Sequence, residues 1–322
     1  MPMTPLSSQL HINRPLTNLL ISYRNPQYLA DQLFPILPVQ KKSDIIPKYL
    51  QSAFFRDDAK LRAEGTKSQG SGFQVDTSAT YFCNRYSFRF EIADEQRDNT
   101  DQPFDLDRDG AIFAADKVLM RRERNFSTTL FTTGIWNGGT DQVYGGAGLT
   151  QWSNYAGSNP LVDIASDADL VEGNIGREAN TLVMGKQVWV QLKWHPDLID
   201  TIKYTALGKV KQETVIELTD LTKVFVGRGL FTSSPEGTAE SAVTYSRIWG
   251  KNALLMYVPD GPGINIPAAG ITFVWQRVPS AGQYIKRFRD EERETDIIEA
   301  NSYFAQVQIN QFGGVFLSGV VA

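Results

Sequence analysis

The chain has 322 residues, 42% of them hydrophobic, and a formal net charge of −4 at pH 7. This length can bury one large core or two smaller ones, and the negative charge argues against general nucleic-acid binding. The sequence has neither an apolar stretch of ~18 to 20 residues to cross a bilayer nor a secretory signal at its start. The single cysteine, Cys83, cannot form an internal disulfide and fits a reducing compartment.

The N-terminal segment is basic and interrupted by prolines. Its Lys and Arg residues up to position 50 are Arg14, Arg24, Lys41, Lys42 and Lys48. Only Asp31 and Asp44 oppose them. In the apolar run LFPILPVQKK, Pro35 and Pro38 exclude a regular helix. We therefore expect an extended arm, which is either solvated or has the first four of those basic side chains facing DNA.

A polar tip at residues 56–72 precedes a segment of strand-like alternation at residues 81–92. The apolar or aromatic positions of that segment are Phe82, Tyr86, Phe88, Phe90 and Ile92. This pattern predicts a strand with one buried face and places Cys83 on its polar side, where a catalytic nucleophile is not expected. The charged residues of the tip are Arg56, Asp57, Asp58, Lys60, Arg62, Glu64 and Lys67. Ordering the backbone costs ~1 to 2 kcal/mol per residue, and the tip has almost no apolar surface whose burial could offset this cost. The tip is therefore either a disordered surface loop or is held by a partner.

The longest predicted helix covers residues 105–130. Its apolar positions Ile112, Ala115, Leu119, Phe126 and Leu130 recur at intervals of three, four or seven residues. Acidic residues gather before and inside its first turn, where the helix dipole favours negative charge.

The same acidic cluster also matches a calcium-binding loop. Asp105, Asp107, Asp109, Gly110 and Asp116 fit positions one, three, five, six and twelve of an EF-hand loop. The polar stretch EQRDNTDQPF before it shows no apolar stripe for the preceding helix that an EF-hand needs. We therefore predict a charged helix start and no metal, with calcium binding kept as the alternative.

The central segment predicts a compact α/β lobe. A helix is expected at residues 167–178, a buried strand at 181–184, a helix opening at Lys186, and a second helix opening at Pro196. Another short helix at 214–218 and a strand at 223–226 complete the lobe. Strands at 254–258 and 271–275 follow, and strands at 284–288, 303–309 and 315–320 are expected to return beside the long helix.

A search for catalytic or cofactor motifs finds none. The two histidines are His11 and His195, and HExxH, phosphate-loop, GxGxxG and GxSxG patterns are missing. His195 directly precedes Pro196, where a helix cap or a packed ring is expected rather than a base. We predict a protein that is not an enzyme and has no cofactor.

Three segments together resemble one known family. The run NTLVMGKQVWVQLKWHPDLIDTIKYT, the phrase LFPILPVQKK and the junction WSNYAGSNPLVDI are similar to the major capsid proteins of tailed bacteriophages with the Hong Kong 97 fold. The resemblance implies a mixed α/β chain with an N-terminal arm (1–44), an extended β-hairpin loop (45–92), a peripheral domain with a long spine helix (93–160), an axial domain (161–278) and returning peripheral strands (279–322).

The resemblance also implies function, partners and location. Subunits would form pentamers and hexamers of an icosahedral head that encloses double-stranded DNA, with portal, scaffold and decoration proteins as further partners and without a membrane. The protein would be made in the bacterial host's cytoplasm and end in the virion. An encapsulin-like nanocompartment shell is the alternative. Some family members join a loop lysine to a neighbour's asparagine. Lys60, Lys67, Asn301 and Asn310 lie in the relevant regions, but no local motif fixes the pair.

Overall fold

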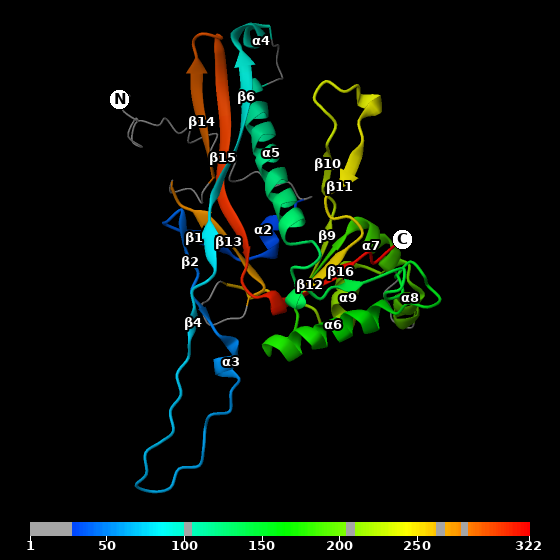
Figure 1. Cartoon of the computed structure of the whole chain (residues 1–322). Coiled ribbons are helices and arrows are strands. Elements are labelled where there is room, and N and C mark those ends of the chain that lie inside the picture. Colours follow the sequence, from blue (N-terminus) through cyan, green and yellow to red (C-terminus); the bar gives the residue numbers. More distant parts are fainter. Residues whose placement is uncertain (1–27, 100–104, 204–209, 262–267, 278–282) are drawn as a thin grey trace.

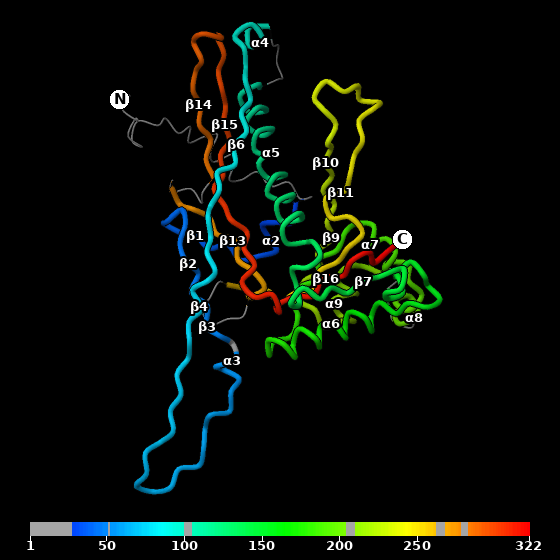
Figure 2. Tube along the Cα trace, in the orientation of Figure 1, coloured from blue at the N-terminus to red at the C-terminus, as the bar shows by residue number. Residues whose placement is uncertain are grey.

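The computed structural model describes residues 28–99, 105–203, 210–261, 268–277 and 283–322. A long sheet backed by a helix forms one part of the molecule, and an α/β lobe lies beside its lower end (Figure 1). A thin loop leaves the base of the long sheet and points away from its upper end (Figure 2). None of the helices in these described ranges is long and apolar enough to cross a membrane.

The long sheet is built around one strand, β15 (Thr295–Gln308). Its first part pairs antiparallel with β14 (Gln283–Asp290) on one side and with β6 (Asn84–Ala93) on the other. Its last residues pair with β13 (Gly270–Trp275), to which β1 (Ile36–Val39) adds in parallel. The strand therefore runs from the far tip of the sheet down to the lobe, and segments from both ends of the chain share one sheet.

The helix α5 (Leu106–Thr129) packs along this sheet. Small residues of the helix meet apolar residues of the strands in one core cluster, made of Ile92, Ala111, Ala114, Ala115, Val118, Ile285, Ile298 and Ala300. At Gly110 a Cβ atom would stand 2.4 Å from a ring carbon of Phe90, so glycine permits the close approach. Asp105 caps the helix, because its carboxylate accepts a hydrogen bond from the N–H of Arg108 at 3.1 Å. The predicted helix and its acidic start are confirmed.

The lobe contains a second five-stranded sheet in the order β7-β16-β12-β8-β9. Its strands are β7 (Gln142–Val143), β8 (Thr181–Gly185), β9 (Lys223–Gly227), β12 (Ala253–Met256) and β16 (Gly314–Ser318). Its helices are α6 (Pro160–Ile175), α7 (Lys186–Lys193), α8 (Pro196–Ile202) and α9 (Gln212–Thr219). These elements confirm the expected order of strand, helices and strand in the central segment.

Short elements complete the described chain. The helices are α2 (Ala30–Leu33), α3 (Gln51–Phe54) and α4 (Asp94–Asp98), with 3₁₀ turns at Asn137–Gly139, Glu240–Ala242 and Gln311–Gly313. Two ladders form the stem of the thin loop: β2 (Ser43–Ile45) with β5 (Thr80–Phe82), and β3 (Lys48–Tyr49) with β4 (Val75–Asp76). A separate hairpin of β10 (Leu230–Thr232) and β11 (Tyr245–Arg247) rises from the lobe beside α5 (Figure 1).

Three expectations from the sequence are wrong in detail. The helix predicted from residue 167 begins at Pro160, because Asn159 caps it by accepting from the N–H of Val162. Residues 315–320 do not return beside α5, since β16 pairs with β12 and β7 in the lobe. Cys83 is fully buried in the break between β5 and β6, with its thiol 3.8 Å from the carbonyl oxygen of Phe273. That burial raises the pKa of the thiol to about 11, which suits an inert packing residue.

The alternation at residues 81–92 gives the strand β6 with its predicted face toward α5, although this face is only partly buried. Ile92 is buried, whereas the side chains of Phe82 and Phe88 are 52% and 36% exposed. Ile92 lies in the core cluster with α5 and Phe90 packs against it, whereas the rings of Phe88 and Tyr86 lie beside the α5 side chains of Phe113 and Arg121, each at 5.7 Å. The exposed ring of Phe88 is therefore open to a further contact.

Candidate assembly surfaces

The extended loop, defined here as residues 50–74 between β3 and β4, has few contacts with its own subunit. After α3 it has no regular structure, and of the charged tip residues only Asp58 is partly buried. Most of its internal contacts are local, such as the hydrogen bond from the Thr66 hydroxyl to the carbonyl oxygen of Ala63 at 2.7 Å, while the ring of Phe55 lies against Gly176 at the end of α6. Lys60 and Lys67 project from this exposed stretch. The geometry leaves the loop free to contact another molecule.

Large apolar side chains on the extended loop escaped the sequence analysis. Leu61 is completely exposed, and Phe54, Phe55 and Phe73 are 60 to 64% exposed. The rings of Phe54 and Phe73 lie 5.8 and 5.1 Å from that of Tyr49, which stiffens the stem of the loop. Aromatic and leucine residues inside a charged stretch were the available signal, because exposed groups of this size characterise interaction surfaces.

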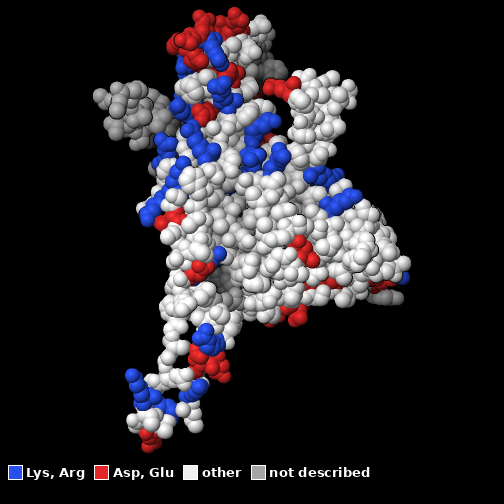
Figure 3. All heavy atoms as spheres, viewed as in Figure 1, with Lys and Arg blue, Asp and Glu red and all other residues white. Residues whose placement is uncertain are grey.

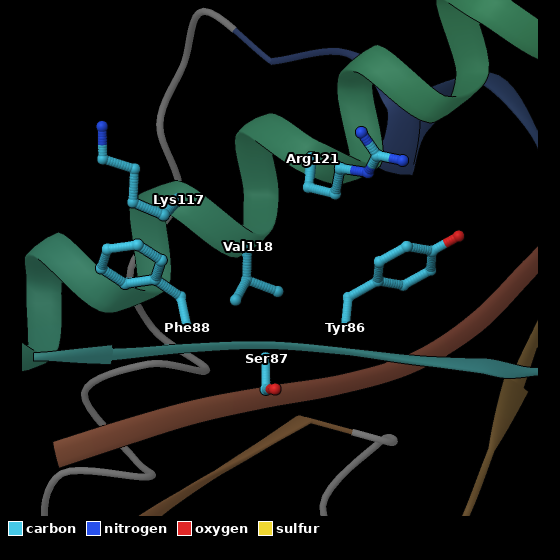
Figure 4. A pocket seen from close by; sticks show the side chains of 6 residues that line it. All are labelled: Tyr86, Ser87, Phe88, Lys117, Val118 and Arg121. Atoms are coloured by element: carbon cyan, nitrogen blue, oxygen red, sulfur yellow. The ribbon is translucent and has the colours of Figure 1, made fainter. Parts of the chain in front are cut away.

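A groove between β6 and α5 lies next to the open part of that strand. It is a hollow of about 300 Å³ lined by Tyr86, Ser87, Phe88, Lys117, Val118 and Arg121 (Figure 4). The ammonium group of Lys117 lies 5.0 Å from the ring centre of Phe113, and the guanidinium group of Arg121 lies 5.7 Å from that of Tyr86. Aromatic walls with two cations at the rim suit an apolar side chain accompanied by a carboxylate.

A buried ionic cluster fixes the segment from which the N-terminal residues leave. The carboxylate of Glu123, on α5, accepts hydrogen bonds from the N–H groups of Leu29 and Ala30 at 2.9 and 2.7 Å. It also accepts one from the indole N–H of Trp249, in the lobe, at 2.6 Å. Next to it, the Nε atom of Arg122 lies 2.7 Å from Asp31. One carboxylate therefore joins the arm, the long helix and the lobe.

Burial decides the electrostatics of this cluster. It raises the pKa of Glu123 to about 7 even though the three donated hydrogen bonds oppose the shift, and it lowers the pKa of Arg122. The sequence analysis missed both residues. The signal was their place in the apolar stripe of the helix, because Arg122 stands four residues after Val118 and four before Phe126, both buried.

The basic residues predicted to face DNA are only partly visible. Arg14 and Arg24 lie outside the described residues. Lys41 is exposed and pairs with Asp44 at 2.9 Å, while the ammonium group of Lys42 lies 4.7 Å from the ring centre of Phe82. The DNA-facing role of these four residues stays a prediction.

The acidic residues of the calcium alternative do not encircle a common point. Asp105 caps α5, and Asp107, Asp109 and Asp116 lie along the helix itself. Asp107 pairs with Arg97 at 3.0 Å and with Arg287 at 3.4 Å. No group of three or more His, Cys, Asp or Glu side chains able to hold a metal ion occurs in the described part of the chain. The loop that an EF-hand requires is a helix here.

A serine, a histidine and an aspartate in the lobe resemble a catalytic triad only in outline. The Nε2 atom of His195 is 3.0 Å from the hydroxyl of Ser158, and its Nδ1 atom is 3.6 Å from the carboxylate of Asp197. That Nδ1 atom accepts from the N–H of Asp197, so the ring proton is on Nε2 and His195 cannot deprotonate the serine. Both side chains are buried, and the histidine caps α8 as one of the sequence expectations proposed.

The lobe core contains two neighbouring acids, Asp163 and Asp167, of which only the first has well-defined hydrogen-bond donors within the described ranges. Asp163 accepts from the indole N–H of Trp152 at 2.8 Å and from the hydroxyl of Tyr144 at 3.2 Å. One turn later, Asp167 is 3% exposed, and its Oδ2 atom has no partner among the described residues. Burial, and secondarily the charge of Asp163, raise the pKa of Asp167 to about 7.

Asp167→Asn should make the stability of the subunit less dependent on pH. Because the folded-state pKa is raised from about 4 to about 7, the stabilisation by the neutral acid is complete below pH 4 and is lost as the pH rises to 7. Above pH 8 the substitution should increase the free energy of unfolding by up to roughly 4 kcal/mol, and at pH 4 it should change little. Urea unfolding of unassembled subunits measures this, with exposed Asp169→Asn on the same helix as the control. Equal effects of the two variants at pH 8 would contradict the assignment.

Mature particles should carry no covalent link between subunits. Of the two candidate asparagines, Asn301 is fully buried, and its side-chain oxygen accepts from the Nε atom of Arg85 at 2.7 Å. The side chain of Asn310 accepts from the N–H of Phe312. Boiled particles should run on a denaturing gel near 36.0 kDa. A ladder of dimers, pentamers and hexamers that disappears in Lys60→Arg or Lys67→Arg particles would refute this.

Comparison with known proteins identifies two similar sequences that cover most of the chain. No known family profile matches it. The major capsid protein of Burkholderia phage BcepMu is 25% identical over 97% of this chain and 98% of its own. That of Pseudomonas phage JBD67 is 26% identical over 76% of this chain and 77% of its own.

Solved structures share the fold at lower identity. A phage-related protein from Bordetella bronchiseptica has a TM-score of 0.74 at 18% identity, covering 97% of this chain and 98% of that one. The capsid structure of cyanophage P-SCSP1u has a TM-score of 0.59 at 11% sequence identity, covering 98% of this chain and 92% of that one. An encapsulin from Synechococcus elongatus has a TM-score of 0.53 at 10% sequence identity, again covering 98% of this chain and 92% of that one. The predicted fold class and the resemblance on which it rested are confirmed: the chain has the mixed α/β fold of phage capsid proteins and is similar in sequence to phage major capsid proteins.

Proposed function

We propose that this chain is the structural subunit of an icosahedral bacteriophage head. Similarity to a phage major capsid protein over nearly the full length of both chains carries the proposal. Such a subunit assembles with copies of itself and is located in the virion. Its role is to build a shell rather than to catalyse a reaction, and the triad-like residues of the lobe serve packing and helix capping.

The arrangement of elements supports a division of labour within the subunit. The lobe would serve as the axial domain that clusters in pentamers and hexamers, and the long sheet with α5 as the peripheral domain. The strand β13, at residues 270–275, belongs by its pairing to the long sheet, so the boundary of the axial domain at residue 278 should move to before this strand. The described start of the arm is held by Glu123 and by the pairing of β1 with β13.

The extended loop would clasp a neighbouring subunit. Its exposed Leu61, Phe54, Phe55 and Phe73 need a partner, and the groove between β6 and α5 offers aromatic walls and two cations. The tip also carries Asp57 and Asp58, which suit the rim formed by Lys117 and Arg121. The completed shell would enclose double-stranded DNA, with portal, scaffold and decoration proteins as further partners, after synthesis in the host's cytoplasm.

An encapsulin-like nanocompartment remains the second candidate, because an encapsulin shares the fold. Full-length sequence similarity favours the phage head, since both curated relatives are phage major capsid proteins. Neighbouring genes separate the two: terminase and portal genes accompany a head protein, and a cargo-enzyme gene accompanies a nanocompartment.

Electron microscopy of the expressed protein tests the proposal. Closed shells of uniform size, formed alone or with a co-expressed scaffold, are expected. A protein that stays monomeric with the complete set of neighbouring head genes would refute a shell-forming role.

A further inference from the structure

Five basic side chains gather where the β10–β11 hairpin leaves the lobe. This basic patch consists of Arg124, Lys186, Lys193, Arg228 and Arg247. Lys186 and Arg228 directly follow the paired residues Gly185 and Gly227 of β8 and β9, and Arg247 pairs with Leu230. Partial burial, and secondarily the positive charges of Arg228, Lys193 and Arg247, lower the pKa of Lys186, so these three charges lie within electrostatic reach of its ammonium group. The guanidinium group of Arg124 lies 4.1 Å from the ring centre of Phe231 on β10, so the patch continues onto α5. Lys and Arg side chains gather at this place on the molecular surface (Figure 3).

In the described part of the chain, no acidic side chain forms an ion pair with the patch. None of its five side chains has an ion-pair partner within 4.0 Å among the residues that the structure describes, and Arg228 and Arg247 are exposed. Like charges held together without an acid cost free energy unless an external anion neutralises them. In a chain of net charge −4, this concentration is a local feature that overall composition hides.

The acidic end of the molecule does not supply the missing charge. Acidic residues dominate the far tip of the long sheet, at the β14–β15 turn and α4 (Figure 3). Much of that charge is already paired, since Asp94 and Glu291 bind Arg289, and Asp296 binds Arg287 and Arg97. An external polyanion fits the patch better than this tip of a second copy.

We propose that the basic patch contacts the phosphate backbone of double-stranded DNA inside the shell, a proposal that rests on the shell function above. The face with the base of the β10–β11 hairpin is then the inner face of the head. Contacts by flexible, exposed Arg and Lys side chains neutralise phosphates without reading sequence. Five such contacts give a slope of about −4.5 in log K against log salt concentration.

Charge-neutralised variants of the full chain test the contact. The patch variant combines Lys193→Gln, Arg228→Gln and Arg247→Gln. A matched control combines Arg177→Gln, Lys203→Gln and Lys223→Gln, which remove the same charge outside the patch. A third variant, Arg14→Gln with Arg24→Gln, tests the arm. Fluorescence anisotropy of unassembled subunits with a labelled random-sequence duplex measures affinity between 50 and 200 mM salt, and electron microscopy records shell closure.

The patch variant should still close shells. It should bind DNA roughly 100-fold more weakly than wild type at 100 mM salt, and the magnitude of its slope of log K against log salt concentration should fall by about 2.7. The matched control should keep most of the DNA affinity and most of the salt slope. Closed wild-type shells should not bind duplex added from outside. Undiminished binding by the patch variant, or a loss confined to the arm variant, would overturn the proposal. Failure of only the patch variant to close shells would make the patch a contact between subunits. If wild-type subunits form no shells under any condition, the shell function fails, and the anisotropy still decides whether the patch binds DNA.

Discussion

Shells should fail to close when residues 56–72 are replaced by a short Gly/Ser turn, although the subunit should remain folded. The replaced residues are exposed apart from Asp58 and contact little of their own subunit, so few stabilising contacts disappear. Loop-length entropy changes by only ~0.6 kcal/mol per doubling, so unfolding should be almost unaffected. Every subunit in the shell would lose its clasp on a neighbour at once. Static light scattering and electron microscopy should show soluble subunits or small rings in place of shells.

A second variant separates the length of the loop from its chemistry. Replacing residues 56–72 by a Gly/Ser segment of equal length keeps the reach but removes Leu61 and the charged side chains. We expect the same failure of closure, and a weaker defect for Leu61→Ala alone. Normal shells from either full replacement would mean that the tip is a surface loop without a role in assembly.

Glu123→Ala should be among the most destabilising single substitutions in the chain. It leaves three buried donors without an acceptor, the N–H groups of Leu29 and Ala30 and the indole N–H of Trp249. Each unsatisfied donor costs ~1 to 3 kcal/mol, so the free energy of unfolding should fall by roughly 3 to 5 kcal/mol. Urea unfolding of unassembled subunits measures the loss, and limited proteolysis should cut sooner around residues 28–34.

Two comparisons test the cause of that loss. Asp109→Ala, at an exposed position of the same helix, should change stability by no more than about 1 kcal/mol. Glu123→Gln keeps one acceptor oxygen and should lose less than Glu123→Ala. Since the folded-state pKa of Glu123 is raised to about 7, wild-type stability should decline between about pH 4.5 and pH 7, and this part of the decline should disappear in Glu123→Gln. A Glu123→Ala protein as stable as wild type would contradict the role of the carboxylate as a junction.

The sequence predicts element boundaries correctly where a single proline or glycine determines the backbone conformation. Pro196 begins α8, and Gly185 ends β8 before α7. At Gly185 a Cβ atom would stand 2.0 Å from the carbonyl oxygen of Gly250, a second reason for glycine at that position. The start of α6 was missed although Asn159 and Pro160 form a recognisable cap, because the apolar periodicity of its inner face was followed only from residue 167.

Non-local pairing was beyond the reach of sequence patterns. The apolar residues Val315, Phe316 and Leu317 of β16 fit either sheet, and only the pairing of this strand with β12 places them in the lobe. Cys83 stands on the polar side of an alternating segment, yet a break between β5 and β6 turns it inward. The basic patch is assembled from five residues spread between positions 124 and 247, so no window of sequence shows it.

The shared length of α5 and β15 makes the long part of the subunit a lever. The helix has 24 residues, about 36 Å, and the strand that lies along it has 14. Both are continuous hydrogen-bonded elements, so they turn as one rigid rod about their junction with the lobe. A tilt of about 6° at that junction moves the far tip by about 4 Å, which is close to the spacing of one strand residue. In the proposed shell, small rotations of the lobe would thereby be magnified at the far tip of the long sheet.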